Sequence, residues 1–204
     1  MSNILSPIGF RWHGLYGDAI NPTSGLVTMK ISSADTVTAG EGDPLKFLAT
    51  GYVSFWTKGT AASQFAGVFK SCSYYSVGMG RKVWKNYWPG NDASGDVTVQ
   101  LAAGSGAPAP RFIVQSGGAT APLTMTSVWS TTDVNTTSVT GSIVGGFYRS
   151  GCTLDATTGT TTTSPFRIVG LWSDIGAPGS PGTDLTTPYN WVIVEANNIQ
   201  ATGI

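Results

Sequence analysis

Residues 97–101 read Val-Thr-Val-Gln-Leu, an alternation of apolar and polar side chains with a period of two. The same alternation occupies residues 27–31, which read Val-Thr-Met-Lys-Ile. Side chains of a β-strand point alternately to the two faces of a sheet, so this pattern places one face of each segment on a core and the other toward water. Both segments are therefore predicted to be strands.

Other short apolar segments lack this alternation and are rich in β-branched residues, which is typical of strands buried on both faces. They are Phe112-Ile113-Val114, Phe166-Arg167-Ile168-Val169 and Trp191-Val192-Ile193-Val194. Clusters rich in Gly and Pro at 104–110 and 176–182 mark turns between such segments. No convincing amphipathic helical window occurs. The sequence predicts an all-β fold, with a β-sandwich or jelly-roll-like domain over residues 26–204.

The composition limits the classes of protein to which the chain can belong. The 27 Gly, 11 Pro, 27 Thr and 21 Ser together supply 86 of the 204 residues, whereas Lys, Arg, Asp and Glu together supply 22. Coiled coils and helical bundles need strong helix formers and charged faces, so both are excluded. The aromatic share of 11% and the hydrophobic share of 41% exclude a disordered chain.

The formal net charge is zero, with 11 Lys and Arg against 11 Asp and Glu. A neutral chain exerts no long-range field toward nucleic acid or an anionic membrane, so we expect neither to be a partner. Binding should then depend on shape and buried aromatic area, and should tolerate salt. The sequence has no bilayer-spanning apolar segment, and residues 1–10 carry no export signal, which predicts a protein made in the cytoplasm.

Residues 1–25 differ from the rest of the chain, because Gly and Pro interrupt every possible element while several aromatic and aliphatic side chains demand burial. We predict an irregular, aromatic-rich N-terminal arm here. It could lie across the β-domain of its own chain or reach onto a neighbouring molecule. The sequence leaves both arrangements open.

The residues that most enzymes and metal sites use are scarce. His13 is the single histidine, and no nucleophile-elbow, dinucleotide-binding, P-loop or zinc-protease motif is present. Glu41 and Glu195 lie in no recognisable motif. Cys72 and Cys152 are far apart and form no CxxC pattern, which favours buried, reduced thiols over zinc ligands or a disulfide. We expect no enzymatic activity, no catalytic residue, no metal and no cofactor.

Residues 91–96, which read Asn-Asp-Ala-Ser-Gly-Asp, resemble the beginning of a calcium-binding loop, because oxygen-bearing side chains occupy every second position. The segment lacks the distal glutamate that an EF-hand needs. A tight connection into the strand at 97–101 explains the same residues. We expect a hairpin turn here.

The most distinctive local feature is residues 81–90, Arg-Lys-Val-Trp-Lys-Asn-Tyr-Trp-Pro-Gly, which interleave cations with large aromatics. In single-stranded nucleic-acid binders, aromatics stack on bases while cations follow phosphates. Trp, Tyr and Arg also anchor protein interfaces, and Lys and Arg stems cover buried aromatic bodies. Zero net charge and the absence of a nucleic-acid-binding motif favour an interface. The predicted interface residues are Phe10, Trp12, Tyr16, Arg81, Trp84, Tyr87 and Trp88.

A series of short apolar and aromatic motifs runs along residues 50–195. They are Gly67-Val68-Phe69 with Cys72 and Tyr74-Tyr75, then Trp84 and Tyr87-Trp88-Pro89-Gly90, then Gly95-Asp96-Val97 and Phe112-Ile113-Val114-Gln115, and finally residues 165–171, 187–190 and 192–194. Their order resembles that of the decoration, or cement, proteins of tailed-bacteriophage heads.

The resemblance implies a β-rich protein that is added to the outer face of an assembled phage head, as a homotrimer or another homo-oligomer. Its partner would be the major capsid protein, and it would stabilise contacts between neighbouring capsid subunits on the surface of the virion. The resemblance identifies no residue that touches the capsid. The interface residues named above follow from physical reasoning alone.

Two other classes of function share this composition. A phage fibre or carbohydrate-binding β-module would stack exposed Trp and Tyr on sugars, and fibre repeats, which the sequence lacks, would favour a fibre. A glycan-cleaving enzyme would need two carboxylates converging in a cleft roughly 5–9.5 Å apart. Head decoration is the function that we expect.

Overall fold

The structure is a computed structural model that describes residues 3–15, 25–91, 95–101, 110–118, 121–135, 141–159, 164–172 and 184–197. Strands and their connections make up these residues, and the helical segments among them are two short 3₁₀ turns, Ala62–Gln64 and Met125–Ser127. The all-β fold predicted from the sequence is confirmed. Its jelly-roll variant is not.

The strands follow one another along the chain as β1 (Arg11–Leu15), β2 (Leu26–Ile31), β3 (Ala39–Gly40), β4 (Pro44–Phe47), β5 (Val53–Phe55), β6 (Phe65–Ser76), β7 (Arg81–Lys85), β8 (Tyr87–Trp88), β9 (Gly95–Leu101), β10 (Pro110–Gln115), β11 (Thr131–Thr132), β12 (Ser142–Val144), β13 (Phe147–Arg149), β14 (Phe166–Trp172) and β15 (Trp191–Ala196). The strands predicted from the apolar patterns lie within β2, β9, β10, β14 and β15.

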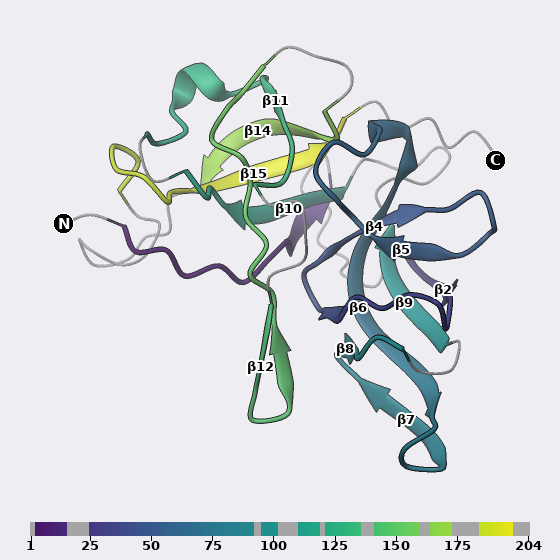
Figure 1. The fold of residues 1–204 in the computed structure, drawn as a ribbon. Helices are drawn as coiled ribbons and strands as arrows, with labels where there is room; N and C mark the ends of the chain where they lie inside the picture. Colours follow the sequence, from purple (N-terminus) through teal and green to yellow (C-terminus); the bar gives the residue numbers. More distant parts are fainter. Residues whose placement is uncertain are drawn as a thin grey trace.

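The upper part of the molecule in Figure 1, which we call lobe A, contains a five-stranded antiparallel sheet in the order β1-β10-β15-β14-β11. Its middle strand, β15, lies between β10 and β14, which explains its continuous apolar sequence. Val194 pairs with Phe112 on one side and with Ile168 on the other, and all three side chains are buried. This row forms part of the core of lobe A.

The strands in the lower right of Figure 1 form lobe B, a sheet in the order β4-β5-β2-β9-β6-β7 in which β4 also pairs with β6. The first five strands therefore close into a ring. β2 and β5 are parallel, whereas the other neighbours in the ring are antiparallel. β7 lies outside the ring and pairs with the far end of β6.

The 12-residue strand β6 belongs to both lobes. Phe65 and Val68 lie in the core of lobe A, whereas Phe69 lies in the core of lobe B. The strand crosses β9 closely at Gly67, where φ is +147° and an added Cβ would lie 2.1 Å from the carbonyl oxygen of Gln100. Only glycine fits such an approach. The two hydrophobic cores thus lie on either side of one continuous strand.

The N-terminal segment is irregular up to residue 10 and differs from the prediction beyond it. Residues Arg11–Leu15 form β1, whose pairing with β10 satisfies main-chain groups that the sequence alone left without partners. The main-chain N–H of Ser6 donates to Gln115 Oε1 at 2.9 Å, and Gln115 Nε2 donates to the Ile4 carbonyl at 2.9 Å. The described part of this segment therefore packs on its own chain.

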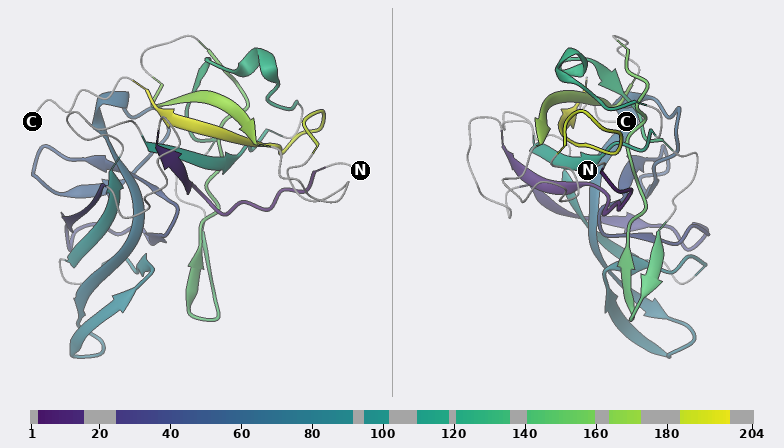
Figure 2. Two further views of the ribbon diagram at one scale, coloured as in Figure 1. Left: turned by 180° about the vertical axis from the view of Figure 1, so that it is seen from behind. Right: turned by 90° about the vertical axis from the view of Figure 1, so that its left-hand side faces the viewer.

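Two hairpins project from the body on the same side of the molecule, as the front, back and side views show (Figures 1 and 2). The first hairpin is the distal part of β6 with β7. The second hairpin is β12 with β13, which form a separate two-stranded sheet.

Candidate interaction surface

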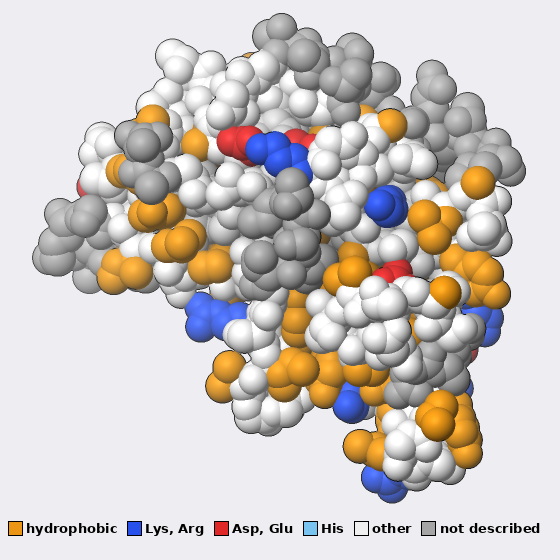
Figure 3. Space-filling model, in the orientation of Figure 1, with side chains coloured by type: hydrophobic (Ala, Val, Ile, Leu, Met, Phe, Trp, Pro, Cys, Tyr) orange, Lys and Arg blue, Asp and Glu red, His pale blue; other side chains and the backbone are white. Residues whose placement is uncertain are grey.

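The two hairpins carry exposed apolar side chains. Trp84 on the first hairpin is 71% exposed, and Phe147 on the second is 72% exposed. We call the whole set the hairpin surface; its members are Tyr75, Val77, Met79, Trp84, Val144 and Phe147. Figure 3 shows hydrophobic side chains over both hairpins. Scattered exposed hydrophobics are common, but their concentration on projecting elements is typical of a binding surface.

Strand register directs the large side chains of the first hairpin outward. Trp84 lies opposite Ser73, and Tyr75 lies opposite Lys82. Residues directly opposite each other in an antiparallel pair point to the same face, so Trp84, Tyr75 and Lys82 share one face. Tyr74 points the other way and is buried in the core of lobe B. The outer face of the first hairpin thus combines two aromatics with a cation.

The second hairpin turns at Gly145 and Gly146, whose φ angles are +59° and +83°. A two-residue turn with positive φ at both positions matches the twist of its strands, and glycine adopts it most easily. Val144 lies opposite Phe147 and both are exposed. Tyr148 points to the opposite face of the hairpin and is buried.

Side-chain contacts connect the two hairpins at their bases. Asn86, which directly follows β7, donates through Nδ2 to the Tyr148 carbonyl at 3.1 Å and accepts from the Tyr148 N–H at 3.1 Å. The rings of Tyr87 and Tyr148 stack with their centroids 6.3 Å apart. The position of each hairpin therefore depends on the other.

The second hairpin is also attached to the N-terminal segment. Arg149 donates through Nη2 to Ser6 Oγ at 2.6 Å and through Nε to the Pro7 carbonyl at 3.2 Å. An open hollow of about 300 Å³ lies between them, lined by Leu5, Ser6, Pro7, Ser142, Arg149, Ser150 and Gly151. The N-terminal segment thus supports the root of this hairpin.

Asp43 is fully buried where lobe B meets the chain that follows β13. Its carboxylate accepts hydrogen bonds from the Gly40 N–H at 2.9 Å and from the Ser150 hydroxyl. Burial raises the pKa of Asp43 to about 6, and hydrogen bonds from Ser150, Tyr148 and Gly40 offset only part of that effect. Asp43 therefore links lobe B to the root of the second hairpin. The free energy of this buried link depends on whether the carboxyl group is ionised.

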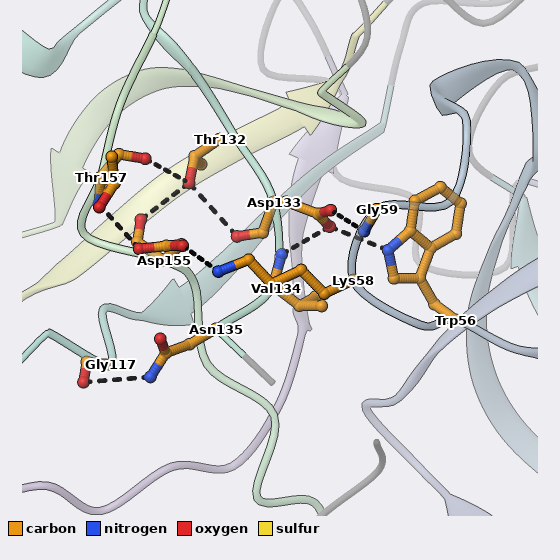
Figure 4. A network of polar contacts seen from close by, with 10 residues as sticks. All are labelled: Trp56, Lys58, Gly59, Gly117, Thr132, Asp133, Val134, Asn135, Asp155 and Thr157. Atoms are coloured by element: carbon orange, nitrogen blue, oxygen red, sulfur yellow. Dashed lines mark hydrogen bonds and ion pairs between the residues drawn. The ribbon is translucent and has the colours of Figure 1, made fainter. Parts of the chain in front are cut away.

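A polar network joins the two lobes (Figure 4). Asp133 of lobe A accepts hydrogen bonds from the Trp56 indole N–H at 2.9 Å and from the Gly59 N–H at 2.7 Å, both from the loop that follows β5. In the same network, Lys58 forms an ion pair with Asp155. These contacts connect the β5–β6 loop to lobe A and so help to hold the lobes in one arrangement.

The structure separates the predicted interface residues. Arg81 and Trp84 are exposed on the first hairpin, and Trp12 is half-buried against the core of lobe A. Tyr16 lies outside the described residues. The side chains that are buried within their own chain, and so offer almost no area to a partner, are Phe10, Tyr87 and Trp88. These three are packing residues.

Sequence reasoning missed the second hairpin. Its signal is Ile143-Val144-Gly145-Gly146-Phe147, a Gly-Gly pair between apolar residues, which is a recognised hairpin pattern. Val77 and Met79 in the turn of the first hairpin were also missed, because apolar residues beside glycines are more often assigned to a core.

The described residues hold no group of three or more His, Cys, Asp or Glu side chains arranged to bind a metal ion. The calcium-like segment is only partly covered, since residues 92–94 lie outside the described part of the chain. None of the helical segments that the structure describes has the length and hydropathy that a membrane crossing requires.

Comparison of the chain with models of known protein families, with curated proteins and with solved structures gives no match. The case for a function therefore rests on the hairpin surface and on the order of motifs in residues 50–195.

Proposed function

We propose that the protein is a decoration (cement) protein of a tailed-bacteriophage head, which binds the outer surface of the assembled capsid through the hairpin surface. The observation that carries this proposal is the pair of apolar hairpins, with Trp84 and Phe147, on one side of an all-β body. The order of motifs in residues 50–195 supports the same function. The partner is the major capsid protein, the protein acts as a homotrimer or another homo-oligomer, and no catalytic activity is involved.

The hairpins are organised before a partner arrives. Hydrogen bonds between Asn86 and Tyr148, and from Arg149 to Ser6, restrain the second hairpin against the body. A surface that is already ordered loses less conformational freedom on binding. Large aromatic side chains contribute most of the binding free energy in protein interfaces, so Trp84 and Phe147 are the expected anchors.

Binding of this kind stabilises a shell by linkage. A ligand that binds only the assembled state stabilises it by RT ln(1 + [L]/Kd), which is about 2.7 kcal/mol per site at a hundredfold excess over Kd. Repetition of the site over the capsid lattice multiplies the effect. A decorated head should therefore resist heat and internal pressure better than an undecorated one.

The test mixes purified protein with expanded heads that lack it, and measures co-sedimentation and the temperature of head disruption. Trp84→Ala and Phe147→Ala should each weaken binding by about tenfold or more, which corresponds to roughly 1.4 kcal/mol. Trp129→Ala is the matched control, because Trp129 is also an exposed tryptophan but lies beside β14 of lobe A, where its main-chain N–H donates to the Ile168 carbonyl at 2.7 Å. It should bind like the wild-type protein.

Two results would contradict parts of this proposal. If the wild-type protein does not co-sediment with heads, it is not a decoration protein of that shell. If the wild-type protein and all three variants bind equally well, the protein decorates heads through another surface.

A carbohydrate-binding module is the second candidate, because Trp129 offers an exposed indole that the hairpins do not use. Its φ is +71°, a conformation that is strained for a side chain of this size, and strained residues cluster at ligand sites. The Arg167 guanidinium carbon lies 6.0 Å from the ring centroid of Trp129. Titration with host surface polysaccharide should quench tryptophan fluorescence in the wild-type protein and not in Trp129→Ala if this function holds.

A further inference from the structure

The zero net charge hides an uneven distribution of charge along the chain. Residues 65–88 and 141–151, which contain the two hairpins, hold five of the 11 Lys and Arg residues and none of the 11 Asp and Glu residues. These five are Lys70, Arg81, Lys82, Lys85 and Arg149. The remainder holds six cations and 11 acids, so the hairpin segments carry a formal charge of +5 and the rest carries −5.

Cations outside the hairpins are mostly paired with carboxylates. The pairs are Arg11 with Glu41, Lys30 with Asp96, Lys58 with Asp155, and Arg111 and Arg167 with Glu195. Arg81 and Lys82 have no carboxylate within 4.0 Å among the residues that the structure describes. Lys85 donates instead to the Tyr87 hydroxyl at 2.9 Å. Lys70, in the middle of β6, is paired with Glu41 at 3.5 Å. The positive charge of Arg81, Lys82 and Lys85 therefore has no carboxylate partner within 4.0 Å among the residues that the structure describes.

We propose that the hairpin surface docks on an acidic protein surface that has apolar pockets between its carboxylates. This inference rests on the proposed function and specifies the chemistry of the capsid area that the protein recognises. Lys82 lies opposite Tyr75 and on the same face as Trp84, so this cation and these two aromatics meet the same patch of the partner. Figure 3 shows Lys and Arg side chains beside the hydrophobic ones on the projecting part of the molecule.

The aliphatic side chains of the hairpin surface favour a protein over a nucleic acid. A single-stranded nucleic acid would stack on Trp84, Tyr75 and Phe147, but it offers no pockets for Val77 and Val144, which are also exposed. Protein surfaces provide such pockets at the centre of an interface. The occupant that fits both the aliphatic and the cationic side chains is thus an acidic protein.

A second copy of the hairpin surface is a poor partner. Two such surfaces would place Arg81 and Lys82 of one copy near the same cations of the other, and like charges facing across an interface are unfavourable. Contacts within the proposed homo-oligomer therefore use a different part of the molecule, which leaves the hairpins of each subunit for the capsid.

The cationic and the apolar side chains of the hairpin surface should affect different rate constants of binding. Complementary charge accelerates encounter, whereas buried apolar area determines how slowly the complex dissociates. The screening length falls from roughly 8 Å at 0.15 M salt to roughly 3 Å at 1 M, so added salt should slow association with little change in dissociation. The association rate should therefore depend on salt, in contrast to the salt tolerance that the zero net charge predicts.

The test measures association and dissociation rates of the protein on immobilised, expanded heads that lack it, at 0.15 M and 1 M salt. Lys82→Glu and Arg81→Glu should each reduce the association rate by about fivefold at the lower salt concentration and by less than about twofold at the higher. Lys46→Glu is the matched control, since Lys46 lies outside the hairpins and its Nζ donates to the Thr57 hydroxyl at 3.2 Å. It should associate within about twofold of the wild-type rate.

Three outcomes would overturn the inference. If both hairpin variants associate at the wild-type rate, the capsid area is not acidic, although head decoration itself stands. If the wild-type protein binds no heads at either salt concentration, the proposed function and this inference both fail. If a 20-residue oligo-dT binds the wild-type protein and Lys82→Glu abolishes that binding, the hairpin surface recognises nucleic acid.

Discussion

Trp84 and Trp88 are separated by three residues, yet they lie in opposite environments: Trp84 is 71% exposed and Trp88 is 0% exposed. Asn86 ends the pairing of β7 with β6, and the next strand, β8, pairs instead with β3 through Ala39. This change of partner directs Trp88 into lobe B, where its ring lies 5.2 Å from that of Tyr74. One aromatic segment thus supplies both a core residue and a surface residue.

The two tryptophans should differ in their contribution to stability. Trp88→Ala should lower the free energy of unfolding by about 3–5 kcal/mol, because it leaves a cavity in a closed core. Trp84→Ala should change it by less than about 0.5 kcal/mol, because the side chain is exposed. Urea unfolding followed by circular dichroism measures both. A Trp84→Ala variant as unstable as Trp88→Ala would mean that Trp84 is not a surface residue.

Asp43 should make stability depend on pH. Its pKa is raised from 3.8 to about 6 in the folded state, so the folded protein binds more protons than the unfolded one between these values. Stability should therefore fall as the pH rises from about 4 to about 6.5, by about 3 kcal/mol in all. Asp43→Asn should remove this dependence, as measured by urea unfolding across the range.

Asp184→Asn is the control for this pH experiment. The pKa of Asp184 is lowered by hydrogen bonds from Thr186, so it titrates below the window in which Asp43 titrates. Its pH profile should match that of the wild-type protein above pH 4. A pH slope that persists in Asp43→Asn would assign the dependence to another group.

Asp133 should be the residue of the network between the lobes that contributes most to the free energy of unfolding. Asp133→Ala leaves the buried Trp56 indole N–H without its acceptor, which should cost about 2–4 kcal/mol of unfolding free energy. Lys58→Ala, which breaks the partly exposed pair with Asp155, should cost less than about 1 kcal/mol. Urea unfolding measures both variants. Equal losses of unfolding free energy would show that the more buried contact is not the more stabilising one.

Cys72 and Cys152 should be unreactive in the folded protein. Both are buried and unpaired, and burial raises the pKa of Cys72 to about 12 and that of Cys152 well above its usual value. Iodoacetamide should modify both thiols at least about 100-fold more slowly in the native protein than in urea without reductant. Mass spectrometry measures the rates. Thiols that stay unlabelled in urea until a reductant is added would indicate a disulfide.

The strands that can be predicted from sequence are those whose pattern is local. Alternation at 97–101 and the apolar run at 191–194 predict β9 and β15 without knowledge of any partner. β1 was not predicted, because its Gly and Pro neighbours obscured the alternation of Phe10 and Trp12, both of which face the core of lobe A. The division into two cores depends on which strand packs on each face of β6, and no local pattern contains that information.

The interaction surface could be predicted only in part, for the same reason. Residues 81–90 were recognised as an aromatic and cationic segment, and Trp84 and Arg81 are indeed exposed. Trp88 has the same residue type but pairs with a strand 49 positions away, at Ala39. Its burial is a consequence of that long-range pairing. The charge separation between the hairpins and the body was visible in the sequence but required the hairpins to be located first.

The strand order also determines when each sheet can be completed during synthesis of the chain. All strands of lobe B lie within residues 26–101, whereas β1 pairs with β10, and β10 pairs with β15 at residues 191–196. At roughly 5–20 residues per second, about 5–20 s of translation separate β9 from β15. During that interval Phe10 has no completed core to enter. Of the strands that the structure describes, β1 is synthesised first, yet the sheet that it joins is complete only after β15 has been made.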